Sequence, residues 1–310
     1  MSELALQNNK NKFAYPVLKW AGGKGQLLSQ LSEKFPDKLR CGAIKKYIEP
    51  FVGGGAVFFD IANSYYFEKA YLFDVNPELI ILYNVIKYNV IELIEQLDTM
   101  QNAYFASDDK KNFYYQMRTE YNQFDKDINA NDYSLSFIRR AALTIFLNRT
   151  CFNGLFRVNS KGLFNVPVGS YKNPRILDKN NLLAVSNVLA KAEILQADFS
   201  KTLEFADENT FVYYDPPYRP LNSASFTTYA VESFNDSEQI RLKKVFDQVH
   251  QYGALQMLSN SDPTNVRDDP FFDNLYKNYN IYRVLAKRLI NSNASGRSEI
   301  REILITNYGV

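Results

Sequence analysis

The chain has 310 residues, of which 46% are hydrophobic and 23% charged, so it is long enough for one large domain or two smaller ones with a real core. It contains no run of about 18 apolar residues that would predict a membrane helix, and its polar start does not resemble a signal peptide. Its two cysteines lie far apart in the sequence and do not suggest a disulfide framework. We therefore expect a soluble protein of a reducing compartment.

Histidine and charge narrow the possible chemistry. The single histidine, His250, lies in an amphipathic stretch, which argues against a histidine-based triad, a zinc site with several histidines or a histidine general base. The net charge is only +2, but residues 137–175 contain no acid and seven cations. Such a block suits a polyanion, although a merely solvated basic face remains the alternative. The seven cations are Arg139, Arg140, Arg149, Arg157, Lys161, Lys172 and Arg175.

The first part of the chain alternates between strand and helix patterns. Residues 45–51 and 69–74 predict strands, and each is followed by a helical pattern. Asn76 can cap the second helix, and Pro77 suits its first position. This βαβα order predicts a parallel sheet flanked by helices.

The middle of the chain has a different pattern, and the strand pattern returns after it. Residues 90–150 show helical periodicity, and residues 149–175 indicate mostly loops. A long helix is expected over 236–252, and the last two strands suit an antiparallel pair around the polar loop 290–298. We predict a doubly wound α/β domain with a mostly helical, basic insertion after its second helix. The later strands are predicted over 192–198, 210–215, 253–260, 279–289 and 299–308.

A glycine-rich turn, "EPFVGGGAVFF" (49–59), joins a strand to a helix. Gly53 and Gly55 would let a ligand approach the backbone closely, but Phe58 stands where a dinucleotide fingerprint needs its third glycine. A tight turn without a ligand is therefore an alternative. Asp74 and Asp198 end later strands, where carboxylates can meet ribose hydroxyls and an adenine edge. Together these positions favour a nucleoside-type ligand.

The stretch "LKWAGGKGQLL" (18–28) also indicates a loop that opens a helix. It is not a phosphate-binding P-loop, because Lys24 is followed by Gly25 and has no upstream glycine at the required distance.

The corner "DPPY" (215–218) follows an apolar strand. Proline fixes φ and lacks an N–H, so Asp215 and the Pro216 carbonyl would stand as two acceptors beside the flat ring of Tyr218. Two acceptors suit an amino group with two hydrogens, and the exocyclic amine of adenine would become more nucleophilic when both hydrogens are bound. The alternative is a structural corner whose aspartate caps a helix.

Several motifs, in their order, resemble one family over nearly the whole chain. The sequence resembles the D12 class of adenine-N6 DNA methyltransferases, which includes the bacterial Dam enzymes and the GATC-methylating enzyme of the DpnII system. The motifs are "KWAGGK" (19–24), "EPFVGGG" (49–55), "FDVNPELI" (73–80), "NRTCFNGLFRVNSKGLFNVPVGSYKNP" (148–174), "ADF" (197–199), "DPPY" (215–218) and "SNS" (259–261).

This resemblance implies a Rossmann-like methyltransferase sheet that binds S-adenosylmethionine and releases S-adenosylhomocysteine. The catalytic domain would comprise residues 1–88 and 177–310, and a target-recognition domain would comprise 89–176. The target adenine would be held by Asp215, Pro216 and Tyr218, and no metal is implied. The expected cofactor residues are Trp20, Ala21, Gly22, Gly23, Lys24, Phe51, Gly53, Gly55, Asp74, Asp198, Phe199 and Asp215.

The resemblance also implies double-stranded DNA as the partner and an adenine taken out of the base stack. Arg157 occupies the position of a guanine-reading arginine, while Leu155 and Pro167 occupy positions associated with a thymine. The other expected DNA contacts, some to phosphate and some bracing the gap left by the adenine, are Lys19, Arg149, Phe152, Asn153, Asn159 and Lys172. Lys24 is a further candidate for contact with DNA.

The expected reaction is direct methyl transfer to N6 without a covalent enzyme intermediate, with GATC as the expected site. Neither cysteine has the proline context that cytosine-C5 methylation needs. Two alternatives stay open: methylation of amino groups in RNA or protein glutamine, and an inactive sequence-specific DNA-binding protein. We expect a cytoplasmic, nucleoid-associated monomer of bacterial or phage type, and a cognate restriction endonuclease is a candidate partner.

Overall fold

The computed structural model of the chain describes residues 13–125, 127–220, 234–265, 268–287 and 299–310. The predicted loop 290–298 therefore lies outside the described residues. The chain divides into two compact units, which we call the helical unit and the sheet unit. The helical unit comprises Met1–Gly23, Gly53–Ser64 and Asp74–Gln196, and the sheet unit comprises Lys24–Val52, Tyr65–Phe73 and Ala197–Val310.

In the described part of the chain, seven strands form one sheet in the order β3-β2-β1-β4-β5-β7-β6, which confirms the predicted α/β fold. Strands β1, β2, β4 and β5 pair in parallel, and β7 pairs antiparallel with both β5 and β6. The final antiparallel pair is therefore confirmed. The strands are β1 (Lys46–Glu49), β2 (Lys69–Asp74), β3 (Ala192–Gln196), β4 (Thr210–Tyr214), β5 (Leu255–Ser261), β6 (Asn280–Lys287) and β7 (Glu299–Thr306).

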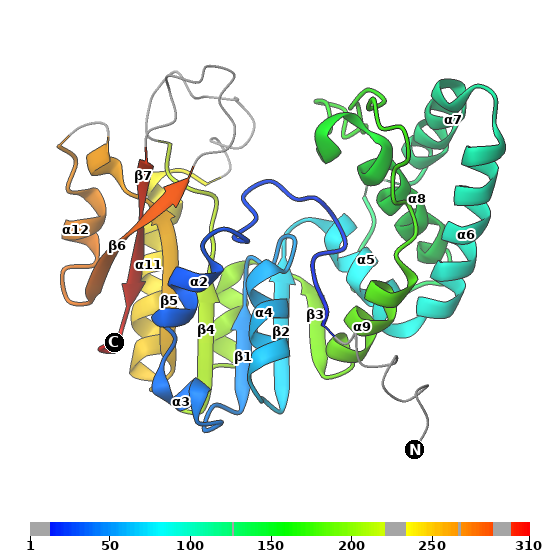
Figure 1. Ribbon diagram of the computed structural model, residues 1–310. Helices are drawn as coiled ribbons and strands as arrows, with labels where there is room; N and C mark the ends of the chain where they lie inside the picture. The colour runs from blue at the N-terminus through cyan, green and yellow to red at the C-terminus, as the bar shows by residue number, and fades with distance from the viewer. Residues whose placement is uncertain (1–12, 126, 221–233, 266–267, 288–298) are drawn as a thin grey trace. The chain divides into compact units, whose positions relative to one another are not determined.

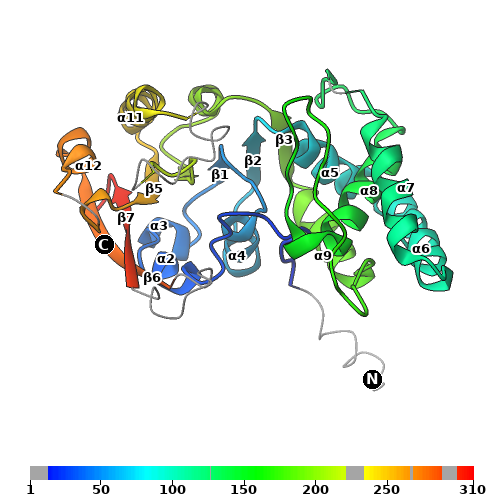
Figure 2. The same cartoon turned by 90° about the horizontal axis from the view of Figure 1, so that it is seen from above.

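The sheet unit places β4 between β1 and β5, with Val212 beside Ile48 on one side and Gln256 on the other. Every residue of β4 is buried, as expected for a central strand covered on both faces. Figure 2 shows α11 on one face of this part of the sheet and α2 and α3 on the other. The helices of this unit are α2 (Leu28–Glu33), α3 (Asp37–Arg40), α11 (Asp236–Gln251) and α12 (Phe271–Leu275).

The helical unit contains the predicted helical insertion. Asn76 caps α5 by accepting a hydrogen bond from the Glu78 N–H, and Pro77 occupies the first turn, as predicted. Glu78 then forms a buried ion pair with Arg140 of α8, which ties the two helices together. Figure 1 shows α6, α7 and α8 side by side. The helices of this unit are α4 (Ala56–Ser64), α5 (Pro77–Tyr88), α6 (Val90–Ala106), α7 (Lys110–Asn122), α8 (Phe137–Thr150) and α9 (Lys179–Leu189).

The predicted elements differ from the observed ones mainly at their ends. The strand predicted over 192–198 stops at Gln196, because Asp198 instead caps a short 3-10 helix over Phe199–Glu204. Helix α9 and the short helices α3 and α12 were not predicted from the sequence. No helix of the described residues is long and apolar enough to cross a membrane.

Candidate active site

The corner at 215–218 follows β4, and its carboxylate, Asp215, is held by neighbouring side chains through one oxygen. Oδ1 of Asp215 lies 2.7 Å from Nζ of Lys24 and accepts a hydrogen bond from Oγ of Ser259 at 3.0 Å. Burial raises the pKa of the Asp215 carboxyl, and the charge of Lys24 and the hydroxyl of Ser259 oppose that rise. Lys24 and Ser259 therefore favour the ionised form of a carboxylate that has been largely removed from water.

Two acceptors of the corner remain available. The Pro217 carbonyl accepts a hydrogen bond from Nε2 of Gln239 at 3.2 Å. Within the described part of the chain, neither the Pro216 carbonyl nor Oδ2 of Asp215 accepts a hydrogen bond. One carboxylate oxygen and one rigidly held carbonyl are thus the free acceptors, as an amino group with two hydrogens requires.

The aromatic residue of the corner is fixed at its hydroxyl end. Tyr218 donates its O–H to Oε2 of Glu302 at 2.6 Å, and Nζ of Lys24 lies 4.5 Å from the centroid of its ring. Burial, followed by the charges of Asp215 and Glu302, raises the pKa of the Tyr218 hydroxyl well above its ordinary value. The side chain is therefore a neutral ring whose orientation is set by β7.

Asp198, an expected cofactor residue of the sheet unit, is paired with an arginine. Arg241 of α11 donates to both of its oxygens, at 2.8 and 2.7 Å, and the Ser200 N–H donates to Oδ1 at 3.0 Å. The hydrogen bonds from Arg241 hold the pKa of Asp198 well below its usual range. In the hydrogen bonds given above among described residues, Oδ1 has two donors and Oδ2 has one, so Oδ2 is the oxygen better able to accept a further N–H.

Aromatic rings surround the same position. The ring of Phe199 lies 5.5 Å from that of Phe51 and 5.9 Å from that of Phe234, centroid to centroid. The guanidinium of Arg241 lies over Phe199 at 3.9 Å. Phe51 and Phe199 are expected cofactor residues, and the structure places them together with Asp198 in the sheet unit.

The glycine-rich turn belongs to the helical unit, where Asp74 fastens it. Oδ2 of Asp74 accepts the Gly53 N–H at 3.0 Å, and its Oδ1 accepts the Asn76 N–H at 2.9 Å. Burial raises the pKa of Asp74 and these backbone donors oppose the rise. Gly55 has a φ of +73°, and a Cβ there would lie 2.8 Å from the ring of Phe59. The turn therefore requires glycine both for its backbone angle and for its packing.

The other expected cofactor residues of the helical unit lie in the loop at residues 20–23. The Trp20 ring lies 5.3 Å from that of Phe156, centroid to centroid. The Trp20 carbonyl accepts the Gly23 N–H at 3.3 Å, and Gly22 has a φ of +78°. Ala21, Gly22 and Gly23 are exposed, so this turn presents its backbone to solvent.

The expected DNA-contacting residues begin with Lys19, which is braced by the insertion. Its N–H and carbonyl both bond to the side chain of Asn148, at 2.8 and 2.9 Å, and its Nζ donates to the Tyr171 hydroxyl at 3.1 Å. A Cβ on Gly154 would meet the Lys19 side chain at 2.3 Å. Residues far apart in the sequence are thus packed around this lysine.

The residues expected to brace the gap left by an adenine are of two kinds. Phe152 and Asn153 are exposed, as is Leu155 of the expected thymine contact, and Asn153 is the only described residue other than glycine with a positive φ, at 56°. Arg149 instead turns inward and donates to the Val17 carbonyl at 2.6 Å, and burial lowers its pKa. The Pro167 carbonyl accepts the Phe152 N–H at 2.9 Å, which fixes the base of this loop.

Arg157 and Asn159 lie in a hairpin-like loop that carries the bridge between Val158 and Phe164. Arg157 is exposed and donates through Nε to Oδ1 of Asn165 at 2.9 Å, and its terminal nitrogens donate to no other described residue. Oδ1 of Asn159 accepts two backbone N–H groups within the turn. Asn159 therefore supports the loop that presents Arg157.

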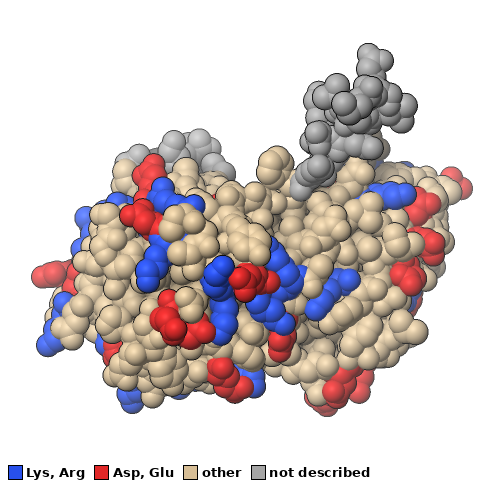
Figure 3. All heavy atoms as spheres, turned by 90° about the horizontal axis from the view of Figure 1, so that it is seen from below, with Lys and Arg blue, Asp and Glu red and all other residues tan. Residues whose placement is uncertain are grey.

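The acid-free block 137–175 is partly neutralised by acids from elsewhere in the chain. Arg139 pairs with Glu120, Arg140 with Glu78, and Arg175 with Asp178. Basic and acidic side chains also lie interspersed on the face drawn in Figure 3. Among the described residues, the cations of the block that have neither an acidic partner nor burial are Arg157, Lys161 and Lys172.

Sequence reasoning missed several partners of the expected site residues. Ser259 stands out in the sequence only as part of the motif "SNS" (259–261). Arg241 lies on an amphipathic helix, where charges are usually solvated. Gln239 and Glu302 have no local signal, because each reaches the corner from a distant element. The described residues contain no group of three or more histidines, cysteines or acids that could hold a metal ion.

Comparison of the sequence with a family model and with named relatives indicates one family. A family model described as D12 class N6 adenine-specific DNA methyltransferase matches residues 20–290. A protein named type II methyltransferase M.MjaIII, from Methanocaldococcus jannaschii, is 48% identical over 94% of this chain and 99% of its own. Type II methyltransferase M1.LlaDCHI from Lactococcus lactis is 39% identical over 98% of this chain and 99% of its own. A DNA adenine methylase from Haemophilus influenzae is 35% identical over 93% of this chain and 92% of its own.

The matched span includes the glycine-rich turn, Asp74, Asp198 and the whole corner at 215–218. The chain therefore belongs to the D12 class of N6 adenine-specific DNA methyltransferases.

Proposed function

We propose that this protein transfers a methyl group from S-adenosylmethionine to N6 of an adenine extruded from duplex DNA. The observation that carries the proposal is the corner at 215–218, where Oδ2 of Asp215 and the Pro216 carbonyl are the acceptors left for the two hydrogens of N6. The neutral ring of Tyr218, fixed by Glu302, supplies a flat face for the base. A duplex hides N6 within the base stack, so the adenine must leave the stack to reach this corner.

The residues of the corner act by alignment and electrostatics. When Asp215 and Pro216 accept both N6 hydrogens, the nitrogen lone pair becomes localised on N6. S-adenosylmethionine, if held by the expected cofactor residues, would supply a sulfonium methyl. N6 would take up that methyl while the electron pair of the carbon–sulfur bond stays on the sulfur. The carboxylate of Asp215 stabilises the positive charge that develops on N6, and one N6 proton then leaves to solvent. No covalent enzyme intermediate is needed.

The donor set of the expected cofactor residues fits a nucleoside. Asp74 accepts a backbone N–H at each oxygen and would meet the ribose hydroxyls. Oδ2 of Asp198 is the oxygen better able to accept an adenine amino N–H, and Phe51 and Phe199 offer apolar faces beside it. Trp20 and the exposed turn at Ala21, Gly22 and Gly23 complete the proposed set together with Lys24, Gly53 and Gly55.

We further propose that residues 89–176 recognise the DNA and that the site is GATC. The terminal guanidinium nitrogens of Arg157 bond to no described residue and suit O6 and N7 of a guanine. Leu155 and Pro167 are exposed for contact with a thymine. Lys172 is an exposed cation suited to phosphate. The names of two relatives as type II methyltransferases support a cognate restriction endonuclease as a partner, and we propose a monomer that acts in the cytoplasm.

The acceptor and the role of the corner can be tested together. Purified protein with radiolabelled S-adenosylmethionine is offered duplex DNA, RNA and glutamine peptides, and we expect label only in DNA. The Asp215→Ala variant should lose at least about 10²–10³-fold in kcat while it retains DNA binding in a mobility-shift assay. Label only in RNA or peptide would contradict the substrate, and full activity of the variant would contradict the role of Asp215.

A further inference from the structure

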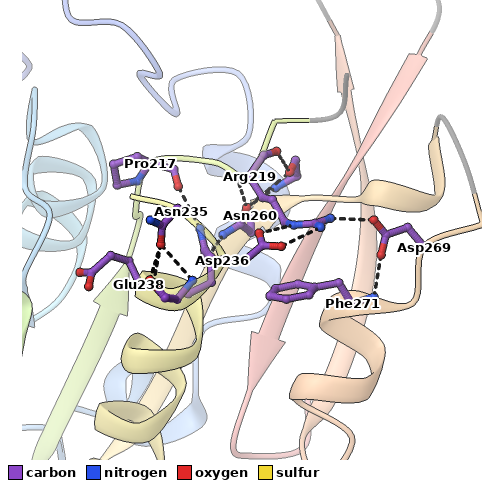
Figure 4. Close-up of polar contacts among 11 residues, drawn as sticks. Pro217, Arg219, Asn235, Asp236, Glu238, Asn260, Asp269 and Phe271 are labelled. Atoms are coloured by element: carbon purple, nitrogen blue, oxygen red, sulfur yellow. Dashed lines mark hydrogen bonds and ion pairs between the residues drawn. The ribbon is translucent and has the colours of Figure 1, made fainter. Parts of the chain in front are cut away.

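Arg219, the residue that directly follows the corner, is fixed to β5 by both of its backbone groups. Its N–H donates to Oδ1 of Asn260 at 3.0 Å, and its carbonyl accepts a hydrogen bond from Oγ of Ser261 at 2.6 Å. Figure 4 shows Arg219 and Asn260 in this arrangement. The chain is thus held at both ends of the corner: by the buried strand β4 before it and by Arg219 after it.

The side chain of Arg219 extends the attachment to two further segments. Its Nε and Nη2 donate to the two oxygens of Asp236, at the start of α11, at 2.7 and 3.0 Å. Its Nη1 donates to Asp269 at 2.7 Å, and its guanidinium lies over the ring of Phe271 in α12 at 4.4 Å. Figure 4 shows the guanidinium reaching from one aspartate to the other.

Most of this arrangement is shielded from water. The side chains of Arg219 and Asp269 are 13% and 15% exposed, whereas that of Asp236 is 53% exposed. The hydrogen bonds that Arg219 donates to Asp236 and Asp269 raise the pKa of Arg219 above its ordinary value. The pair with Asp269 is therefore the less screened of the two, and it should contribute more than an exposed ion pair.

The same elements also hold the corner itself. Gln239 of α11 donates to the Pro217 carbonyl at 3.2 Å and accepts a hydrogen bond from Nδ2 of Asn260 at 3.2 Å. Asn260 in turn accepts the Arg219 N–H. A change in the position of α11 or of Arg219 would therefore move Pro217, and with it the adjacent Pro216 carbonyl.

We propose that Arg219 is a positioning residue for methyl transfer, which acts through Asp236, Asp269 and Asn260 to fix the two acceptors of the corner. This inference rests on the proposed function, because it assigns Arg219 a part in the same site. A misplacement of about 1 Å in a reacting geometry can lower a rate by about 10²-fold. Binding of DNA and cofactor involves many other contacts and should change little.

The test compares Arg219→Met, Arg219→Lys and Asp269→Asn with a matched control. The control, Arg283→Met, removes another sheet-unit arginine that bonds two acids, Asp262 and Asp273. Each variant is assayed with the acceptor that the wild-type protein methylates. Steady-state kcat, the KM for acceptor and cofactor, and Tm are measured for each variant.

We expect Arg219→Met to lower kcat about 10²-fold with each KM within about threefold. Arg219→Lys should restore part of the loss, because an ammonium group can meet one aspartate but lacks the planar fork. Asp269→Asn, which keeps the side-chain volume, should lower kcat about tenfold. The double variant of Arg219→Met and Asp269→Asn should match Arg219→Met alone, since both changes disrupt one unit.

The inference is overturned if Arg219→Met keeps kcat within about threefold of the wild type. It is also overturned if Arg283→Met loses as much kcat as Arg219→Met, because the effect would then follow stability in general. If Arg219→Met does not fold, an unchanged kcat in Asp269→Asn overturns it as well. A wild type that labels only RNA or peptide would contradict the proposed function, whereas an active wild type with unaffected variants would contradict this inference alone.

Discussion

Replacement of Lys24 by methionine tests how the carboxylate of the corner stays ionised. The Lys24 side chain is 7% exposed, and its Nζ lies 2.7 Å from Oδ1 of Asp215, which is 20% exposed. Methionine keeps much of the apolar stem and removes the charge. The pKa of Asp215, which burial already raises, should then rise further.

The size of the effect follows from the closeness of the two charges. A cation within about 4–6 Å typically lowers a carboxyl pKa by about 1–3 units, so removal of the Lys24 charge should raise the pKa of Asp215 further. One unit corresponds to about 1.4 kcal/mol. We therefore expect the variant to lose about 1–4 kcal/mol of unfolding free energy at a pH where Asp215 is ionised.

The sign of the pH dependence is fixed by linkage. Between the ordinary pKa of an aspartate and the raised pKa of Asp215, the folded state binds a proton that the unfolded state lacks. Stability therefore falls as pH rises through this window, and the window extends to higher pH in the variant. The deficit of the variant should shrink as pH falls and Asp215 becomes protonated in both proteins.

Urea unfolding between about pH 5 and 9, together with the pH profile of kcat, measures both effects. The acid limb of the kcat profile should move to higher pH in the variant, because the pKa of Asp215 rises when Lys24 is removed. Lys45→Met is the control, because Lys45 and Glu68 form an exposed pair at 3.1 Å that should contribute about 0–1 kcal/mol. A stability deficit that does not depend on pH, with an unmoved acid limb, would refute the reasoning.

Three further substitutions have distinct expected results. Gly55→Ala should cost about 1–3 kcal/mol in urea unfolding, because the new Cβ would lie 2.8 Å from Phe59 at a φ of +73°; an unchanged midpoint would contradict this. Arg241→Met should weaken cofactor binding about tenfold in titration calorimetry, because Asp198 loses the arginine that donates to both of its oxygens. Unchanged affinity would count against the role of Asp198. Arg157→Ala should cost about 1–3 kcal/mol of discrimination at one guanine in competition binding, whereas a uniform loss over all sequences would mark a phosphate contact.

Local patterns were sufficient to predict most of the fold. The strand that ends at Asp74 and the cap and first turn at Asn76 and Pro77 depend on neighbouring residues, and they are observed where they were predicted. The short helices α3 and α12 were missed because they have too few residues for a periodic pattern. The predicted strand over 192–198 ended early because the capping preference of Asp198 prevailed over its apolar surroundings.

Long-range electrostatic contacts could not be predicted in the same way. The block 137–175 contains only positive charges in the sequence, because the acids that neutralise it, such as Glu78 and Glu120, come from other helices. Arg241 and Asp198 lie far apart in the sequence, and so do Arg219 and Asp269. Nothing in the spacing of such residues reveals which cation meets which acid until the elements are packed.

The most direct test of the account is to methylate an unmodified plasmid with purified protein and S-adenosylmethionine and to map the modified bases by sequencing. We expect N6-methyladenine within GATC on both strands, and we expect none in the reaction with the Asp215→Ala variant. Modification of a base other than adenine, or no modification of duplex DNA by a folded protein that binds the cofactor, would contradict this expectation.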